Sequence, residues 1–271
     1  MSDVPPVRPF IIGHRGASAV APENTIAAFA CAMQAGADGI EFDVRLARDG
    51  VPVVIHDATL QRTAQIAGGV SDFTSTQLKQ IDVGSWFNHR HPEVARQEYE
   101  QETVPTLEQV FDLFARGAGI LYLEMKSNDI QVAALSAAVV KLVQNYSFAD
   151  RVIVASFNLS ALEEVKRLDT GISTAALFQP RLERPLALLK RTTMVELAIR
   201  AGANELALHH SLVARRVAHR ATQSSLPVVV WTVDNPTWLK RALSLGIHAL
   251  ITNDPATMIS ERSQLFALKP Q

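Results

Sequence analysis

Short runs of β-branched and other apolar residues recur along the chain, separated by longer stretches whose apolar positions are three and four residues apart. The short runs predict strands and the longer amphipathic stretches predict helices. Eight runs are expected as strands: 10–12, 39–44, 120–123, 152–154, 174–177, 205–208, 228–230 and 249–251. Helices are expected between most of them, at 25–35, 106–116, 130–145, 159–168, 212–222 and 237–245. This alternation is typical of a parallel sheet whose strands are joined by helices.

Eight such units favour a single α/β domain over residues 1–271, folded as a (β/α)8 barrel, and 271 residues is an ordinary length for that fold. An open doubly wound sheet also fits the alternation, but no Gly-x-Gly-x-x-Gly follows the first strand. The alternation fails over residues 45–104, where a further strand-like run at 51–55 precedes a polar stretch. We interpret 45–104 as a small insertion after the second strand, and the irregular segment 179–193 as a loop over the barrel entrance.

Composition narrows the class of protein. The chain is 48% hydrophobic and 20% charged, which is typical of a globular protein. Its 26 Lys and Arg residues balance 27 Asp and Glu residues, so it offers no broad basic surface for nucleic acid. The most apolar helix, 132–143, is too short to span a bilayer, and the proline-containing stretch 1–13 does not resemble a secretion signal. We therefore expect a soluble, cytoplasmic protein without stable membrane anchoring, while its oligomeric state stays open.

Acidic residues stand on the predicted strands, near the end of the barrel where such folds place their active sites. Glu41 and Asp43 are two residues apart, so both point to the same side while Phe42 and Val44 face the helices. Glu124 ends the third predicted strand. Buried carboxylates repel one another unless a cation neutralises them. Three carboxylates without a cysteine cluster predict one hard divalent cation, Mg²⁺, Ca²⁺ or Mn²⁺.

Two histidines and two cations are expected beside these acids. The first strand ends in His14 and Arg15, His56 closes the run at 53–55, and Lys126 is on the same side of its strand as Glu124. Cleavage of a phosphodiester needs anionic oxygen to be neutralised, a hydroxyl to be activated and an alkoxide to be protonated. Arg15 and Lys126 would hold the phosphate, while the two histidines exchange acid and base roles. These residues predict a phosphodiesterase.

The same segments resemble the glycerophosphodiester phosphodiesterase family, TIM-barrel enzymes that release an alcohol and glycerol 3-phosphate. In chain order the resemblance is carried by His14-Arg15-Gly16, Pro22-Glu23-Asn24-Thr25, Glu41-Phe42-Asp43, His56-Asp57-Ala58-Thr59-Leu60 with Arg62-Thr63, Gly84-Ser85-Trp86-Phe87, Val104-Pro105-Thr106-Leu107, Leu123-Glu124-Met125-Lys126, Ser156-Phe157 and Trp231-Thr232-Val233. It implies metal ligation by Glu41, Asp43 and Glu124, acid and base catalysis by His14 and His56, substrate contacts from Arg15 and Lys126, and a mouth lined by Phe157 and Trp231. It also implies a glycerophosphodiester substrate and a cyclic glycerol phosphate intermediate.

Two positions depart from the family pattern. The family often has Asn where this chain has Asp234, and Asp where it has Asn253. We expect neither residue to touch the metal or acid/base positions, so that only the preference for the alcohol is affected.

Three rival functions fit part of the pattern. A phosphatidylinositol-type phospholipase C also uses a barrel and paired histidines, and a lysophospholipase D of the same family would act on a lipid substrate. A third rival is a sensor that binds glycerophosphodiesters without cleaving them. Such a sensor would not need two histidines together with three carboxylates, so hydrolysis of glycerophosphodiesters is the favoured hypothesis.

Overall fold

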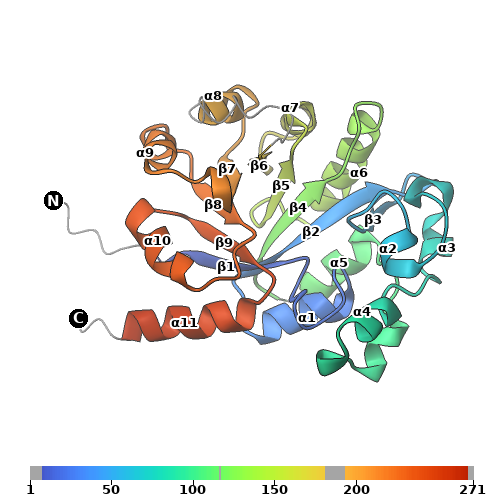
Figure 1. Cartoon of the computed structure of the whole chain (residues 1–271). Helices are drawn as coiled ribbons and strands as arrows, with labels where there is room; N and C mark the ends of the chain where they lie inside the picture. Colours follow the sequence, from blue (N-terminus) through green and yellow to red (C-terminus); the bar gives the residue numbers. More distant parts are fainter. Residues whose placement is uncertain (1–7, 116, 181–192, 268–271) are drawn as a thin grey trace.

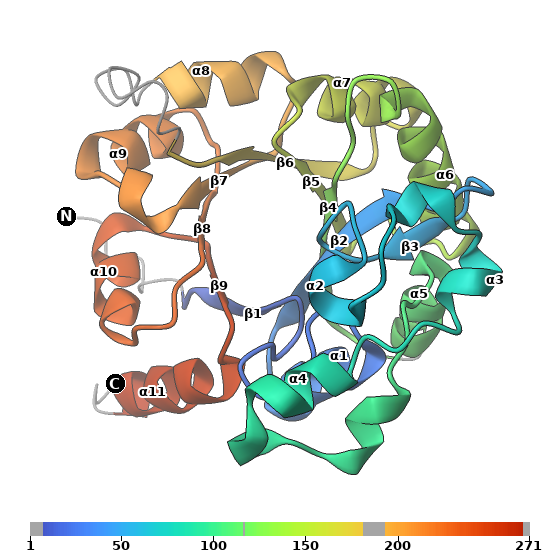
Figure 2. The same cartoon turned by 45° about the vertical axis from the view of Figure 1, so that its right-hand side comes forward.

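Eight parallel strands close into a barrel in the computed structural model, which describes residues 8–115, 117–180 and 193–267. The strands are β1 (Phe10–His14), β2 (Gly39–Leu46), β4 (Ile120–Met125), β5 (Val152–Ser156), β6 (Ser173–Phe178), β7 (Glu205–His209), β8 (Val228–Trp231) and β9 (Ala249–Thr252). β1 completes the ring by pairing with both β2 and β9, and Figure 2 shows this ring end-on. The predicted (β/α)8 TIM barrel is confirmed.

Helices surround the barrel on its outside (Figure 1). They are α1 (Ile26–Gln34), α5 (Leu107–Phe114), α6 (Val132–Asn145), α7 (Leu159–Leu168), α8 (Thr193–Arg200), α9 (Arg215–Gln223), α10 (Thr237–Leu245) and α11 (Pro255–Ala267), with a short 3-10 turn η5 (His210–Leu212) after β7. α8 and α11 are not among the helices expected from the sequence. Most of the expected entrance loop, residues 181–192, lies outside the described residues. None of the described helices is long and apolar enough to cross a membrane.

Strand side chains alternate between the helices and the barrel interior. Phe42 and Val44 on β2 pack in the apolar layer under the helices, as expected from their spacing. Tyr122 of β4 belongs instead to the cluster that fills the barrel, together with residues such as Ile12 and Ile251. Successive side chains of a strand point to opposite sides. Because Phe42 and Val44 face the helices, Glu41 and Asp43 face the barrel interior.

The stretch 45–104 leaves the βα alternation. It contains β3 (Pro52–Val54), which runs antiparallel to β2, the short helices α2 (Gln61–Ala64), α3 (Ser75–Leu78) and α4 (Ser85–Arg90), and the 3-10 turns η1 (Val70–Asp72), η2 (Pro92–Val94) and η3 (Gln97–Gln101). Leu60, Val70 and Leu78 belong to a small apolar cluster of this stretch. Tyr99 donates a hydrogen bond of 3.0 Å to the carbonyl of Val20, before α1. Figure 2 shows its helices gathered on one side of the barrel.

Candidate active site

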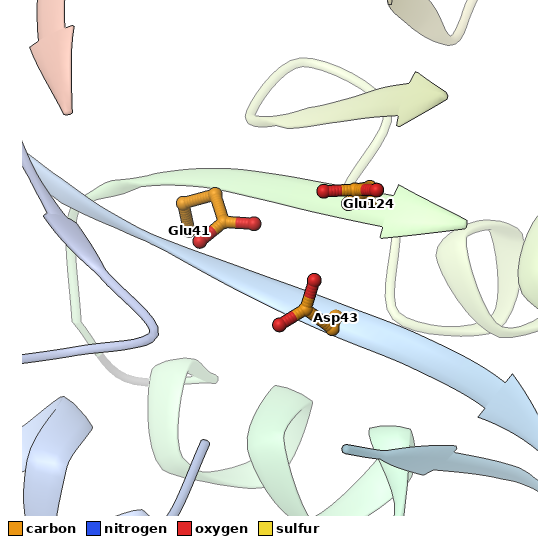
Figure 3. A group of neighbouring side chains, drawn as sticks. All are labelled: Glu41, Asp43 and Glu124. Carbon is orange, nitrogen blue, oxygen red and sulfur yellow. The ribbon is translucent and has the colours of Figure 1, made fainter. Parts of the chain in front are cut away.

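Three carboxylates converge inside the barrel near the carboxyl ends of two neighbouring strands. Glu41 and Asp43 come from β2 and Glu124 from β4, and Figure 3 shows their side chains turned toward one another. Asp43 and Glu124 are partners in the strand register. Each residue offers one oxygen such that the three oxygens lie within 4.8 Å of one another, and all three residues are buried. The convergence expected from the sequence is therefore present in the fold.

The charges of this group are only partly balanced. Burial, then the charges of Asp43 and Glu124, raise the pKa of Glu41, and burial together with Asp43 raises the pKa of Glu124 to about 7. Burial also acts to raise the pKa of Asp43, but Lys126 and Arg15 hold it below its ordinary value. Lys126 Nζ lies 3.1 Å from Asp43 Oδ1 and 2.5 Å from Glu124 Oε1. Three inward carboxylates exceed these two cations by one charge, and three carboxylate oxygens are a donor set that fits a hard divalent cation.

Arg15 connects the end of β1 to the acids. Its backbone has a φ of 55°, a left-handed conformation that is unusual for a residue other than glycine. In this conformation its main-chain N donates to Glu41 Oε2 at 3.1 Å, while its side-chain Nε lies 3.2 Å from Asp43 Oδ2 and its Nη1 donates to Glu23 Oε1 at 2.7 Å. Asn24, with a φ of 59°, exchanges two hydrogen bonds with Asp43. The unusual backbone at 15 and 24 thus serves to orient the acidic group.

His14 lies at the end of β1 beside the acidic group. Its Nε2 is 3.9 Å from Glu41 Oε2, and its Nδ1 is 2.6 Å from Asn253 Oδ1. Burial, followed by the charge of Arg15, lowers the pKa of His14 to about 4. The expectation that Asn253 would not touch an acid/base position is wrong. β9 pairs with β1 in the ring, so the residue that follows β9 faces the residue that ends β1.

His56 reaches the same region from the stretch after β3. Its Nδ1 lies 2.6 Å from Asp57 Oδ1, and Arg62 Nε donates to Asp57 Oδ2 at 2.6 Å. Arg62 also forms two 2.7 Å hydrogen bonds with Glu23, which in turn binds Arg15. Burial lowers the pKa of His56. Glu23, Asp57 and Arg62 are not among the site residues that the sequence predicts, although each falls within a segment that carries the family resemblance.

The predicted side chains surround one cavity of about 490 Å³, and eight of the nine line it: His14, Arg15, Glu41, His56, Glu124, Lys126, Phe157 and Trp231. The ninth, Asp43, lies behind them in contact with Arg15 and Lys126. The rings of Phe157 and Trp231 meet edge-on, with centroids 5.5 Å apart. The sequence thus predicted side chains that the fold brings to one place.

A larger cleft of about 720 Å³ lies alongside this cavity. The two share Arg45, Glu124, Lys126 and Phe157 as lining residues. The cleft extends from these residues toward Ser71 of the stretch 45–104 and toward Asn128 in the loop between β4 and α6.

Comparison with known proteins agrees with this geometry. Residues 14–257 match the model of the glycerophosphoryl diester phosphodiesterase family. This chain belongs to that family. A glycerophosphodiester phosphodiesterase of Caldanaerobacter subterraneus subsp. tengcongensis is 34% identical over 254 residues, which are 94% of this chain and 98% of the relative. A glycerophosphodiester phosphodiesterase of Bacillus subtilis is 33% identical over 257 residues, covering 92% and 85% of the two chains.

Solved structures of the glycerophosphoryl diester phosphodiesterase family share the fold. A phosphodiesterase of Oleispira antarctica, solved in complex with its product sn-glycerol-3-phosphate, superposes with a TM-score of 0.81 at 28% identity, covering 94% of this chain and 97% of its own. The resemblance inferred from the sequence motifs is therefore confirmed, as is the assignment of the chain to a family of phosphodiester hydrolases.

Proposed function

We propose that the protein hydrolyses glycerophosphodiesters to an alcohol and sn-glycerol 3-phosphate, with a divalent cation held by Glu41, Asp43 and Glu124. The observation that carries the proposal is the single cavity in which both histidines meet the acidic group and two cationic side chains. When bound, the cation would neutralise phosphate oxygens and make a coordinated hydroxyl more acidic. The product found with the Oleispira antarctica phosphodiesterase supports this choice of substrate.

The hydrogen-bond partners of the two histidines indicate which one acts as the base and which as the acid. An amide oxygen can only accept, so His14 donates from Nδ1 to Asn253 and keeps a lone pair on Nε2, which suits a base. His56 instead directs Nδ1 at the carboxylate of Asp57, which acts to raise its pKa against the effect of burial and so suits an acid. We therefore assign His14 as the base and His56 as the acid of the first step.

In that step the 2-hydroxyl of the glycerol group loses its proton to His14 and its oxygen bonds to phosphorus. The bond from phosphorus to the alcohol breaks, and His56 protonates the departing alcohol. In the second step water loses a proton to His56 and attacks phosphorus, which opens the cyclic glycerol phosphate. His14 then returns its proton to the 2-oxygen. Arg15 and Lys126 neutralise the phosphate throughout.

The rest of the substrate is assigned to the spaces around this centre. The rings of Phe157 and Trp231 line the cavity that would receive the glycerol phosphate group. The adjoining cleft would receive the leaving alcohol, because it shares Lys126 and Glu124 with the cavity. The stretch 45–104 supplies His56, Asp57 and Arg62, so we treat it as an insertion within one catalytic unit of residues 1–271.

The direct test is an assay of metal-stripped protein with glycerophosphocholine and glycerophosphoethanolamine, to which Mg²⁺, Ca²⁺ and Mn²⁺ are returned separately. Activity should depend on an added cation, and glycerol 3-phosphate should be the common product. A substrate analogue without the 2-hydroxyl should resist cleavage. Efficient cleavage of that analogue would show direct attack by water and remove the cyclic intermediate from the mechanism.

A further inference from the structure

Asn253 lies directly after β9, between a carboxylate and a histidine. Its Nδ2 donates to Asp234 Oδ2 at 2.7 Å, and its main-chain N donates to Asp234 Oδ1 at 2.8 Å. Its side-chain Oδ1 accepts from Ser18 Oγ at 2.9 Å and lies 2.6 Å from His14 Nδ1. Its main-chain carbonyl accepts from the N of Ala19 at 3.0 Å. Asn253 therefore joins the loop after β8 to the loop after β1.

These contacts determine which way the amide of Asn253 faces. A carboxylate can only accept hydrogen bonds, so Asp234 requires the NH₂ end of the amide. The oxygen end is then left for His14, and because that oxygen can also only accept, His14 must carry its proton on Nδ1. The Nε2 of His14, which lies on the side of Glu41, is then left with its lone pair.

We propose that Asp234 and Asn253 are positioning residues that fix the tautomer of His14, so that Nε2 can accept a proton. The proposal rests on the function proposed above, in which His14 is the base. An amide at position 234 could donate as well as accept, and the Asn253 side chain would then be free to turn over. Its NH₂ end would favour the tautomer of His14 that is protonated on Nε2, which cannot act as a base.

The tautomer is measured by the ¹⁵N NMR shifts of the His14 ring in the full chain. The wild-type protein should show a proton on Nδ1. In Asp234→Asn the ¹⁵N shifts should indicate protonation on Nε2 or a mixture of the two tautomers. The value of kcat should fall about 10- to 100-fold, the usual loss when a side chain that orients a functional residue is replaced. KM should change by less than about twofold, since no substrate contact is removed. The matched control Asp254→Asn changes the next aspartate, whose carboxylate accepts from Thr257 N at the start of α11, and it should leave the tautomer and kcat unchanged.

The reciprocal exchange Asp234→Asn with Asn253→Asp provides the decisive comparison. A carboxylate at 253 again requires a proton on His14 Nδ1, so the exchange should restore the wild-type tautomer and most of kcat. Unchanged kcat in Asp234→Asn, or a reduced kcat with the wild-type tautomer, would overturn the proposal. If Asp234→Asn does not fold, the proposal is still tested by the tautomer of His14 in the wild type and in the exchange variant. A proton on Nε2 in either protein would overturn it. A wild-type protein with the expected tautomer but no activity on glycerophosphodiesters would refute the proposed function while leaving the positioning role in place.

Discussion

A buried carboxyl at the other end of the barrel makes the stability of the protein depend on pH. Glu205 begins β7, is 7% exposed and accepts a 2.8 Å hydrogen bond from the hydroxyl of Tyr122. Burial raises its pKa from an ordinary 4.5 to about 7, although the hydrogen bond from Tyr122 partly opposes the change. Between these two pH values the folded chain keeps a proton that the unfolded chain releases. Stability should therefore fall as pH rises through this window.

The difference of about 2.5 pH units, at 1.36 kcal/mol each, corresponds to about 3 kcal/mol of unfolding free energy. The substitution Glu205→Gln removes the charge and keeps an oxygen that can accept from Tyr122. At pH 8 the variant should be more stable than the wild type by up to about 3 kcal/mol. At pH 4.5 the advantage should nearly vanish, because the wild-type carboxyl is then protonated in the folded protein.

Urea denaturation at pH 4.5, 6 and 8 measures the two free energies of unfolding. Other buried acids such as Glu124 titrate in both proteins, so their contributions cancel in the difference. Glu163→Gln, on the exposed side of α7, is the matched control and should show no pH-dependent difference. A Glu205→Gln variant that is less stable than the wild type at pH 8, or whose advantage is the same at every pH, would show that the carboxyl of Glu205 does not cause this pH dependence.

Three further predictions concern the active site. His56→Ala should lower kcat about 10²- to 10⁴-fold, the usual contribution of a general acid, without changing the far-ultraviolet circular dichroism; full activity would remove His56 from the mechanism. Glu124→Gln should abolish the rise in melting temperature that Mn²⁺ gives the metal-stripped wild type, and an unchanged rise would place the cation elsewhere. Asn128→Trp should fill part of the adjoining cleft and raise KM for bulky alcohol groups by about tenfold, consistent with a clash of 1–2 kcal/mol. Equal KM changes for small and bulky alcohols would exclude the cleft as the alcohol site.

The barrel could be predicted because its signal is periodic. Each strand is a short apolar run and most helices carry apolar residues at regular spacing, so that the order of elements alone indicates the fold. Apart from the strand-like run at 51–55, which corresponds to β3, the stretch 45–104 showed no such pattern. Its helices are only four to six residues long and are stabilised by local caps, such as the reciprocal hydrogen bonds of Thr74 and Gln77 around α3. A helix of one turn is too short to show a period of 3.6 residues.

The acidic group was predictable for a related reason. Glu41 and Asp43 are two residues apart on one strand, so their side chains lie on the same side of it. The carboxyl ends of parallel strands meet at one end of a barrel, which brings Glu124 close to them. The partners that orient His14 and the other side chains around the acidic group have no comparable local pattern. Asn253 and His14 are separated by 239 residues, and Arg62 is 39 residues from Glu23. Such contacts depend on the exact register of the closed ring and on the path of each loop.

The two histidines differ more in their partners than in their positions. His14 contacts the neutral amide of Asn253, and the carboxylate of Asp234 contacts the other end of that amide. Asp234 therefore acts on His14 only through the orientation of Asn253. His56 meets the carboxylate of Asp57 directly. Both partners accept from the ring and act to raise the pKa, but burial opposes this at both histidines and the charge of Arg15 opposes it further at His14. In the proposed mechanism the two roles therefore rest on these partners: the amide holds a proton on Nδ1 of His14, and the carboxylate of Asp57 acts to raise the pKa of His56 against the effect of burial.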